Sequence, residues 1–110
     1  MTIPSAIRIG SADYKVTVSS EVILSSDHHQ CYGCIDFDKH EIKLADNVGD
    51  IQQQERTFLH EVFHAMLHDR GLEVTEEEKL VDGLAMCMRQ IIRDNQELFL
   101  EKKEEKKNDE

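Results

Sequence analysis

The stretch FLHEVFHAMLH, residues 58–68, is the most informative part of this sequence. It places His60 and His64 four residues apart, with Glu61 directly after the first histidine. On a helix, this spacing puts both imidazoles on one face, one turn apart, where they can reach the same metal ion. Glu61 is rotated by about 100° from His60, which suits a general base better than a ligand. The pattern therefore indicates a zinc site with its own base, as an alternative to a plain amphipathic helix.

The sequence around this motif predicts two consecutive helices. Apolar residues recur at helical spacing over residues 51–70, with Asp50 as the N-cap and Gly71 just past the end. A second apolar stripe predicts a helix that starts after Thr75 and continues to about Leu100. The connection between them is short, so we expect the second helix to fold back antiparallel to the first.

An acidic pair on the second helix supplies candidates for a third ligand. Glu78 and Asp82 stand four residues apart on one edge of the predicted stripe, and the fold-back brings this edge near the two histidines. Two histidines and a carboxylate form a known catalytic zinc set. Thr75 and Glu78 also have the spacing of a capping box, which would occupy the Glu78 carboxylate. Spacing alone leaves Glu78 and Asp82 open as the ligand.

The first half of the chain predicts strands. Residues 7–18 and residues 31–45 both alternate apolar and polar positions around polar turns, as hairpins do. Strands followed by helices predict an α+β fold: a small antiparallel sheet of about three strands, packed on the motif helix and a second, antiparallel helix. We expect a single domain over residues 1–100 and a charged, disordered tail over residues 101–110.

Composition excludes several classes of protein. The chain has 110 residues, a net charge of −10 and a pI near 5.0, so direct nucleic-acid binding is not expected. For the same reason, a DNA-associated protease with this motif is disfavoured. No apolar run approaches the roughly 18 residues of a membrane span. The N-terminus carries no secretory pattern, and three cysteines without one predict reduced thiols in the cytoplasm.

The cysteines have a second interpretation. Cys31 and Cys34 follow His28 and His29 closely enough to suggest a second metal site or a redox pair. No second cysteine pair accompanies them, so we expect a structural role. Cys87 is predicted to be a packed thiol on the buried side of the second helix.

The combination of HEVFHAMLH with EKLVDGLA resembles the ImmA/IrrE family of small HExxH zinc metallopeptidases, which are gluzincin-like. The hairpin CYGCIDFDKHEIKLA resembles that family more loosely, and the resemblance covers about residues 30–95. It implies a minimal zincin-like fold with one Zn²⁺ ion and an origin in a phage or other mobile element. Leu84 stands where the family commonly has Phe, and neither the family's Leu-Leu-Met-Pro segment nor a helix-turn-helix extension is present.

Position by position, the resemblance implies one role for each residue of the site. His60 and His64 match the zinc histidines, Glu61 the base and Glu78 the third ligand. Asp82 matches a residue that orients a histidine ligand. The expected function is a zinc metalloendopeptidase for a narrow protein or peptide substrate, such as a transcriptional repressor. The alternative is a zinc-stabilised protein-interaction module with little or no hydrolytic activity.

Three further residues are candidates on the substrate side. His68 lies about 12 Å along the helix from His60; it is a candidate there, or a cation that stabilises the helix C-terminus. Ile42 and Lys43 belong to a predicted strand that could pair with an extended peptide at a sheet edge. The sequence does not choose an oxyanion donor among Tyr14, Tyr32, His40 and His68.

Overall fold

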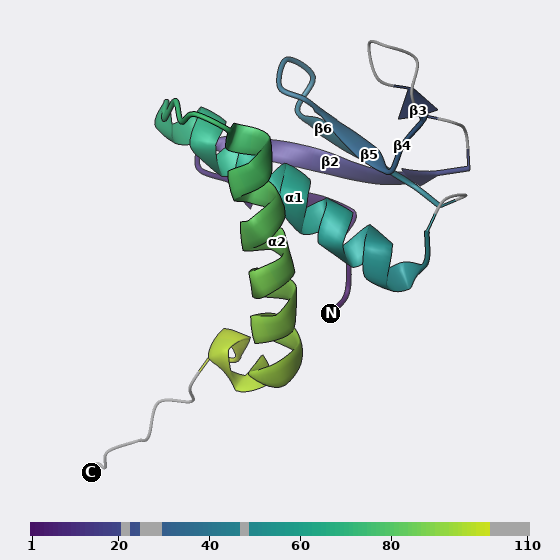
Figure 1. The fold of residues 1–110 in the computed structure, drawn as a ribbon, viewed down its shortest axis with the longest axis vertical. Coiled ribbons are helices and arrows are strands. Elements are labelled where there is room, and N and C mark those ends of the chain that lie inside the picture. The colour runs from purple at the N-terminus through teal and green to yellow at the C-terminus, as the bar shows by residue number, and fades with distance from the viewer. Residues whose placement is uncertain (21–22, 25–29, 47–48, 102–110) are drawn as a thin grey trace.

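A computed structural model describes residues 1–20, 23–24, 30–46 and 49–101 (Figure 1). The strands are β1 (Ala6–Ile9), β2 (Ala12–Ser19), β3 (Ile23–Leu24), β4 (Gln30–Cys31), β5 (Gly33–Asp36) and β6 (Glu41–Ala45). They are followed by α1 (Ile51–Arg70), α2 (Glu77–Asp94) and the 3-10 helix η1 (Gln96–Phe99). The predicted α+β class is confirmed.

The main sheet has four strands in the order β1-β2-β6-β5, and β3 pairs separately with β4. Both predicted hairpins are present, as the antiparallel pairs β1–β2 and β5–β6. The two hairpins join through β2 and β6, which pair in parallel from Lys15↔Glu41 to Ser19↔Ala45. The sheet is therefore mixed, whereas an antiparallel sheet was predicted, because contacts between distant segments decide how the two hairpins pair. It also has one strand more than predicted.

One turn of the sheet reaches the far end of α1. Gly10, between β1 and β2, has φ +62°, and a Cβ there would lie 2.1 Å from Asp69 Oδ1. Glycine is needed at this position both for the left-handed backbone and for the close approach. In the second hairpin, the Asp36 carboxylate accepts hydrogen bonds from the backbone N–H groups of Asp38 (2.9 Å) and Lys39 (3.0 Å). These bonds hold the β5–β6 turn beside the cleft described below.

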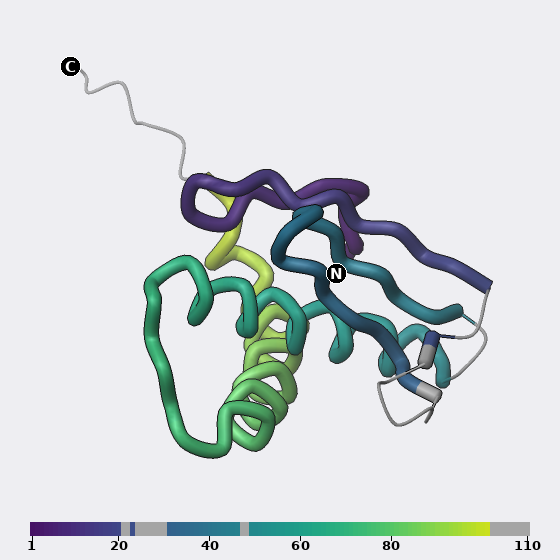
Figure 2. The backbone as a smooth tube through the Cα atoms, turned by 90° about the horizontal axis from the view of Figure 1, so that it is seen from above, coloured from purple at the N-terminus to yellow at the C-terminus, as the bar shows by residue number. Residues whose placement is uncertain are grey.

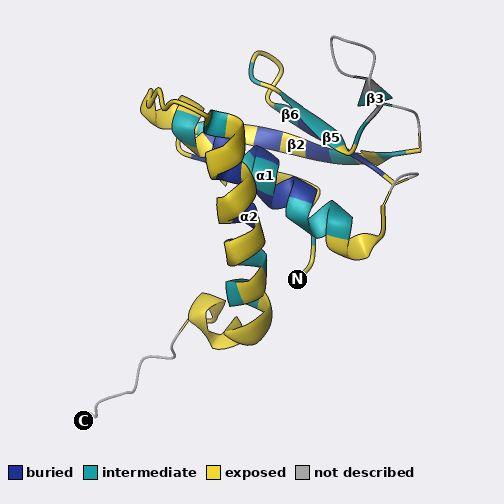
Figure 3. Cartoon of the chain, viewed as in Figure 1, coloured by how far each residue is buried: buried dark blue, intermediate teal, exposed yellow. Residues whose placement is uncertain are grey.

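Helix α1 has the predicted limits and packs across the sheet. The Asp50 side chain accepts from the Gln53 backbone N–H at 2.9 Å, and Gly71 ends the helix with φ +65°. On the sheet side, Ile42 and Leu44 are fully buried. The core also contains Ile9, Tyr14, Val16, Phe58, Leu59, Ala65 and Ala85. Figure 3 shows buried segments on both α1 and β2. Burial of this face of α1 fixes its position on the sheet, and therefore the position of its histidines.

Helix α2 departs from the prediction at both ends. Its N-cap is Glu76, with φ +56° and no side-chain capping bond, so the predicted Thr75–Glu78 capping box is absent. It ends at Asp94 instead of near Leu100, and Asn95 leads into η1. Figures 1 and 2 show α2 crossing α1 steeply, whereas an antiparallel hairpin was expected.

Only one stripe of α2 is covered by other residues that the structure describes. Val81 and Ala85 are fully buried, and Met88 and Ile92 pack against the core. The neighbouring apolar stripe is left outside, and Cys87 on it is exposed, so the predicted packed thiol is wrong. Among the described residues, no helix is both long and apolar enough to cross a membrane. All but the first residue of the predicted tail lies outside the described ranges.

Candidate metal centre

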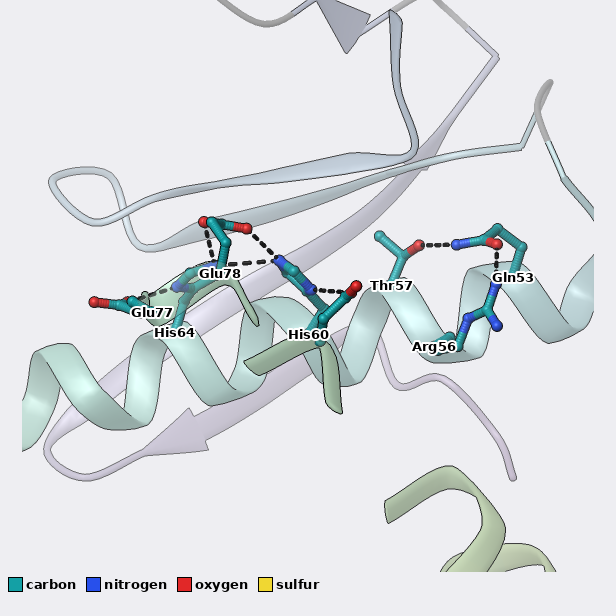
Figure 4. Close-up of polar contacts among 8 residues, drawn as sticks. Gln53, Arg56, Thr57, His60, His64, Glu77 and Glu78 are labelled. Atoms are coloured by element: carbon teal, nitrogen blue, oxygen red, sulfur yellow. Dashed lines mark hydrogen bonds and ion pairs between the residues drawn. The ribbon is translucent and has the colours of Figure 1, made fainter. Parts of the chain in front are cut away.

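His60, His64 and Glu78 converge where α2 begins beside the middle of α1 (Figure 4). The Nε2 atoms of the two histidines are 3.2 Å apart. Glu78 spans both: its Oε1 lies 3.1 Å from His60 Nε2, and its Oε2 lies 2.9 Å from His64 Nε2. Among the described residues, this is the only group of histidine, cysteine or carboxylate side chains with the proximity needed to hold a metal.

These three contacts have the dimensions of a zinc ligand set. Ligands at about 2.0–2.1 Å from a tetrahedral ion lie ~3.3–3.4 Å from one another. The two histidine nitrogens are 3.2 Å apart and each contacts a different Glu78 oxygen, at 3.1 and 2.9 Å, so a small movement of Glu78 would let one oxygen complete the set. The Glu78 side chain is 78% exposed and is free to make that movement. The residues present therefore fit zinc.

The other nitrogen of each histidine faces a carboxylate. His60 Nδ1 lies 3.1 Å from Asp82 Oδ1, and His64 Nδ1 lies 2.6 Å from Glu77 Oε2. Each carboxylate can accept a hydrogen bond from Nδ1–H, and in that tautomer the Nε2 lone pair of the imidazole is directed at the centre. Two lone pairs and the Glu78 carboxylate then face one another at about 3 Å, an arrangement that a cation stabilises.

Glu78 and Asp82, which sequence spacing could not distinguish as the third candidate ligand, contact different nitrogens of the histidines. Glu78 belongs to the group that could hold a metal, whereas Asp82 contacts the opposite nitrogen of His60. Glu77 was missed. Three consecutive glutamates, Glu76 to Glu78, look alike in sequence, and only the left-handed turn at Glu76 determines which of them face α1.

Glu61 lies beside the histidines and is buried, with 7% of its surface exposed. Burial raises the pKa of its carboxyl group; the proximity of His60 and His64 opposes this rise, and the nearby Glu78 adds to it. A carboxylate with increased proton affinity next to the metal position is suited to accept a proton from water. The structure thus brings Glu61 to the centre without making it a member of the ligand group.

Two cavities meet at the centre, and Gly33, His60 and Glu61 line both. The smaller one, about 170 Å³, extends toward the start of α1 and is also lined by Tyr32, Arg56 and Asp82. The wider one, about 650 Å³, lies toward the β5–β6 turn and is also lined by Ile35, Phe37 and Glu78. Together they form a cleft between strand β5 and the two helices.

The predicted substrate-side residues require correction. Strand β6 lies between β2 and β5, and Ile42 is completely buried, so Ile42 cannot face a substrate. Lys43 is exposed on the same inner strand but lines neither cavity. His68 lines neither cavity, and its ring stacks on Phe37 at 4.1 Å between centroids. The sheet edge at the cleft is β5. Because β2 pairs with one side of β6, a pairing that was not predicted, β6 is an inner strand and β5 is left at the edge.

The four candidate oxyanion donors also lie at different distances from the cleft. Tyr14 is buried against His40, with ring centroids 5.2 Å apart, and neither residue lines the cleft. Tyr32 lines the smaller cavity and is half exposed. Of the four candidates, only Tyr32 lies at the cleft.

The cysteine pair borders the wider cavity. Cys31 and Cys34 form no disulfide and are partly buried. Burial raises the pKa of the Cys34 thiol, and the negative charge of Glu61 raises it further. His28 and His29, which suggested a second metal site, lie outside the described residues, so that interpretation stays a prediction.

The chain matches no protein-family model, no curated protein and no solved structure. The resemblance to the ImmA/IrrE family therefore stays a prediction, and the function has to be argued from the site itself.

Proposed function

We propose that this chain is a zinc-dependent metallopeptidase that hydrolyses a peptide bond with Glu61 as general base. One observation carries the proposal: two imidazole Nε2 atoms and the Glu78 carboxylate converge within 3.2 Å, beside a buried glutamate that is not one of them. A structural zinc site is normally closed by four protein ligands, whereas a catalytic site has three and an open position. The described group has three.

The chemistry divides between the metal and the chain. Zinc, when bound, supplies a Lewis acid that makes water nucleophilic near neutral pH. Glu61 accepts the proton of the attacking water and can deliver it to the leaving amine. Asp82 and Glu77 keep His60 and His64 in the tautomer that presents Nε2 to the centre.

The cleft suits an extended peptide. β5 is the edge strand beside the centre and can pair with a substrate backbone, which would align that backbone along the metal position. We include in the proposal a cytoplasmic location, consistent with three cysteines that form no disulfide. We also include the narrow protein substrate that the family resemblance implies, such as a repressor.

The alternative, a zinc-stabilised interaction module, differs in what zinc does for the fold. The core under α1 is closed by Ile42, Leu44 and Val81, all fully buried without help from the centre. Under our proposal, zinc removal therefore abolishes hydrolysis but leaves a cooperatively folded chain. Under the alternative, a chelator unfolds the chain and no peptide is cut.

The test combines zinc content with cleavage of a complex peptide mixture read by mass spectrometry. We expect one zinc per chain in the wild type and in Glu61→Gln, with cleavage lowered roughly 10²–10⁴-fold in that variant. Glu78→Gln should lose affinity for zinc as well as activity. Glu73→Gln, which removes the same charge from an exposed position, should retain both. Equal cleavage by the wild type and Glu61→Gln would refute the assignment of the base.

A further inference from the structure

Arg56 is a cation at the cleft that the proposed hydrolysis does not use. It lies one helical turn before His60 on α1 and lines the smaller cavity with His60, Glu61 and Tyr32. Its guanidinium donates a hydrogen bond to the side-chain oxygen of Gln53 (Figure 4). The Gln53 amide donates in turn to Thr57 Oγ1 at 3.1 Å. This chain of contacts holds Arg56 on the face of α1 that carries the metal ligands.

The partner of Arg56 is neutral, which sets it apart from the other arginines. Arg8, Arg70, Arg89 and Arg93 each have a carboxylate within 4.0 Å. Among the described residues, Arg56 has none. It is also the only arginine or lysine among the described residues that line either cavity.

The surroundings of Arg56 are strongly acidic. Glu61, Glu77, Glu78 and Asp82 all border the cleft, and the chain as a whole carries a net charge of −10. Such a surface repels an acidic substrate unless a local cation offsets the repulsion. A guanidinium that is already oriented, and that pairs with no carboxylate in the described part of the chain, can offer a planar pair of donors to an incoming carboxylate.

We propose that the smaller cavity is a specificity subsite in which Arg56 binds a carboxylate of the substrate. This inference rests on the proposed peptidase function and deepens it by naming the substrate class: peptides with an acidic group next to the scissile bond. Tyr32, at the mouth of the same cavity, offers a hydroxyl as a second donor.

The strand direction predicts on which side of the scissile bond the acidic group lies. β5 runs from Gly33 to Asp36, and Gly33 is its residue at the smaller cavity. A peptide that pairs antiparallel to β5 runs the opposite way, so its C-terminal part reaches Gly33 and Arg56. The carboxylate then belongs to a residue after the scissile bond. It is either an aspartate or glutamate side chain or the C-terminal carboxylate of the peptide.

Binding of small peptides tests the subsite without depending on turnover. The full chain is used as Glu61→Gln with zinc added, so that peptides stay intact. Two pairs of acetylated tripeptides are titrated: one ends in glutamate amide or glutamine amide, the other in alanine with a free or an amidated C-terminus. Dissociation constants and the NMR signal of the Arg56 Nε–H are followed. The first pair reports a side-chain carboxylate and the second a terminal one.

We expect the carboxylate member of one pair to bind at least about tenfold tighter than its amide and to shift the Arg56 signal. Arg56→Gln, added to the same chain, should abolish this preference, and Arg56→Lys should retain part of it. Arg93→Gln removes the same charge from an exposed helical position and should change nothing.

Two results would overturn the subsite: neither pair discriminates, or the preference survives Arg56→Gln. Both are distinguishable from failure of the proposed function. Zinc-dependent cleavage by the wild type without any carboxylate preference refutes only the subsite. A carboxylate preference in a chain that never cleaves any peptide refutes only the hydrolysis.

Discussion

His64 Nδ1 and Glu77 Oε2 are 2.6 Å apart, the shortest contact around the candidate centre. Asp82 contacts the Nδ1 of His60 in the same way, so both histidines of the candidate centre have a carboxylate of α2 on the side away from it. The centre thus consists of two layers of side chains, and its second layer comes entirely from the start of α2. The ligands cannot be oriented without the docking of that helix.

Replacing Glu77 by alanine should weaken zinc binding by roughly 10–100-fold, because His64 loses the partner that fixes its tautomer and ring orientation. Competition with a chromophoric chelator measures the affinity. Glu76→Ala is the matched control: Glu76 is the adjacent glutamate, and its nearest cation is Lys79 at 3.9 Å. Equal losses in the two variants would show that general charge, and not the contact with His64, sets the affinity.

Gly33→Ala should destabilise the fold by about 1–3 kcal/mol, the usual range for overpacking. A Cβ on Gly33 would lie 2.7 Å from Thr57 Cγ2 and 2.8 Å from the Lys43 carbonyl oxygen, which forces β5 away from α1. Urea unfolding followed by circular dichroism measures the change. Gly83→Ala, where a Cβ meets nothing within 4 Å, should instead stabilise helix α2 by about 0.5–1 kcal/mol.

Cys34 should react with iodoacetamide much more slowly than Cys87 at neutral pH. The thiolate is the reactive form, and burial together with the negative charge of Glu61 raises the pKa of Cys34, so little thiolate forms there. Cys87 is exposed. Peptide mapping by mass spectrometry after timed alkylation gives both rates. As the pH is raised, the Cys34 rate should keep increasing to a higher pH than an ordinary thiol would. Faster labelling of Cys34 than of Cys87 would contradict the placement of β5.

Glu55→Gln should lower the free energy of unfolding by about 1–3 kcal/mol, since it leaves a mostly buried guanidinium with a weaker partner. Glu55 Oε1 accepts from Arg89 Nε at 2.9 Å, with only 13% and 19% of the two side chains exposed. The same carboxylate is 3.9 Å from the amino terminus. Asp94→Asn, which breaks the exposed pair with Arg93, should have a smaller effect in the same unfolding assay.

The features that could be predicted from the sequence are those that neighbouring residues determine. Helix α1 begins and ends as predicted because Asp50 and Gly71 are local capping signals. The grouping of His60 and His64 follows from helical periodicity alone. Both hairpins were visible because their turns lie within the predicted segments.

The features that were missed depend on contacts between distant segments. The parallel pairing of β2 with β6 makes β5 the edge strand. Ile42 and Lys43, which were predicted on an edge strand, therefore lie on an inner one. Helix α2 has a wide apolar surface, and periodicity does not say which part the core covers, so Cys87 was misplaced. The capping box failed because the Glu78 carboxylate is used by two histidines instead of its own helix.

The parallel pairing has an evolutionary consequence. β2 and β6 form the centre of the sheet, and residues 31–37 of the excursion between them line the strand side of the cleft. Insertions or substitutions in that excursion can remodel what the cleft admits without disturbing the register of the two central strands. Descendants of such a chain could change what the cleft binds while inheriting the same group of His60, His64 and Glu78.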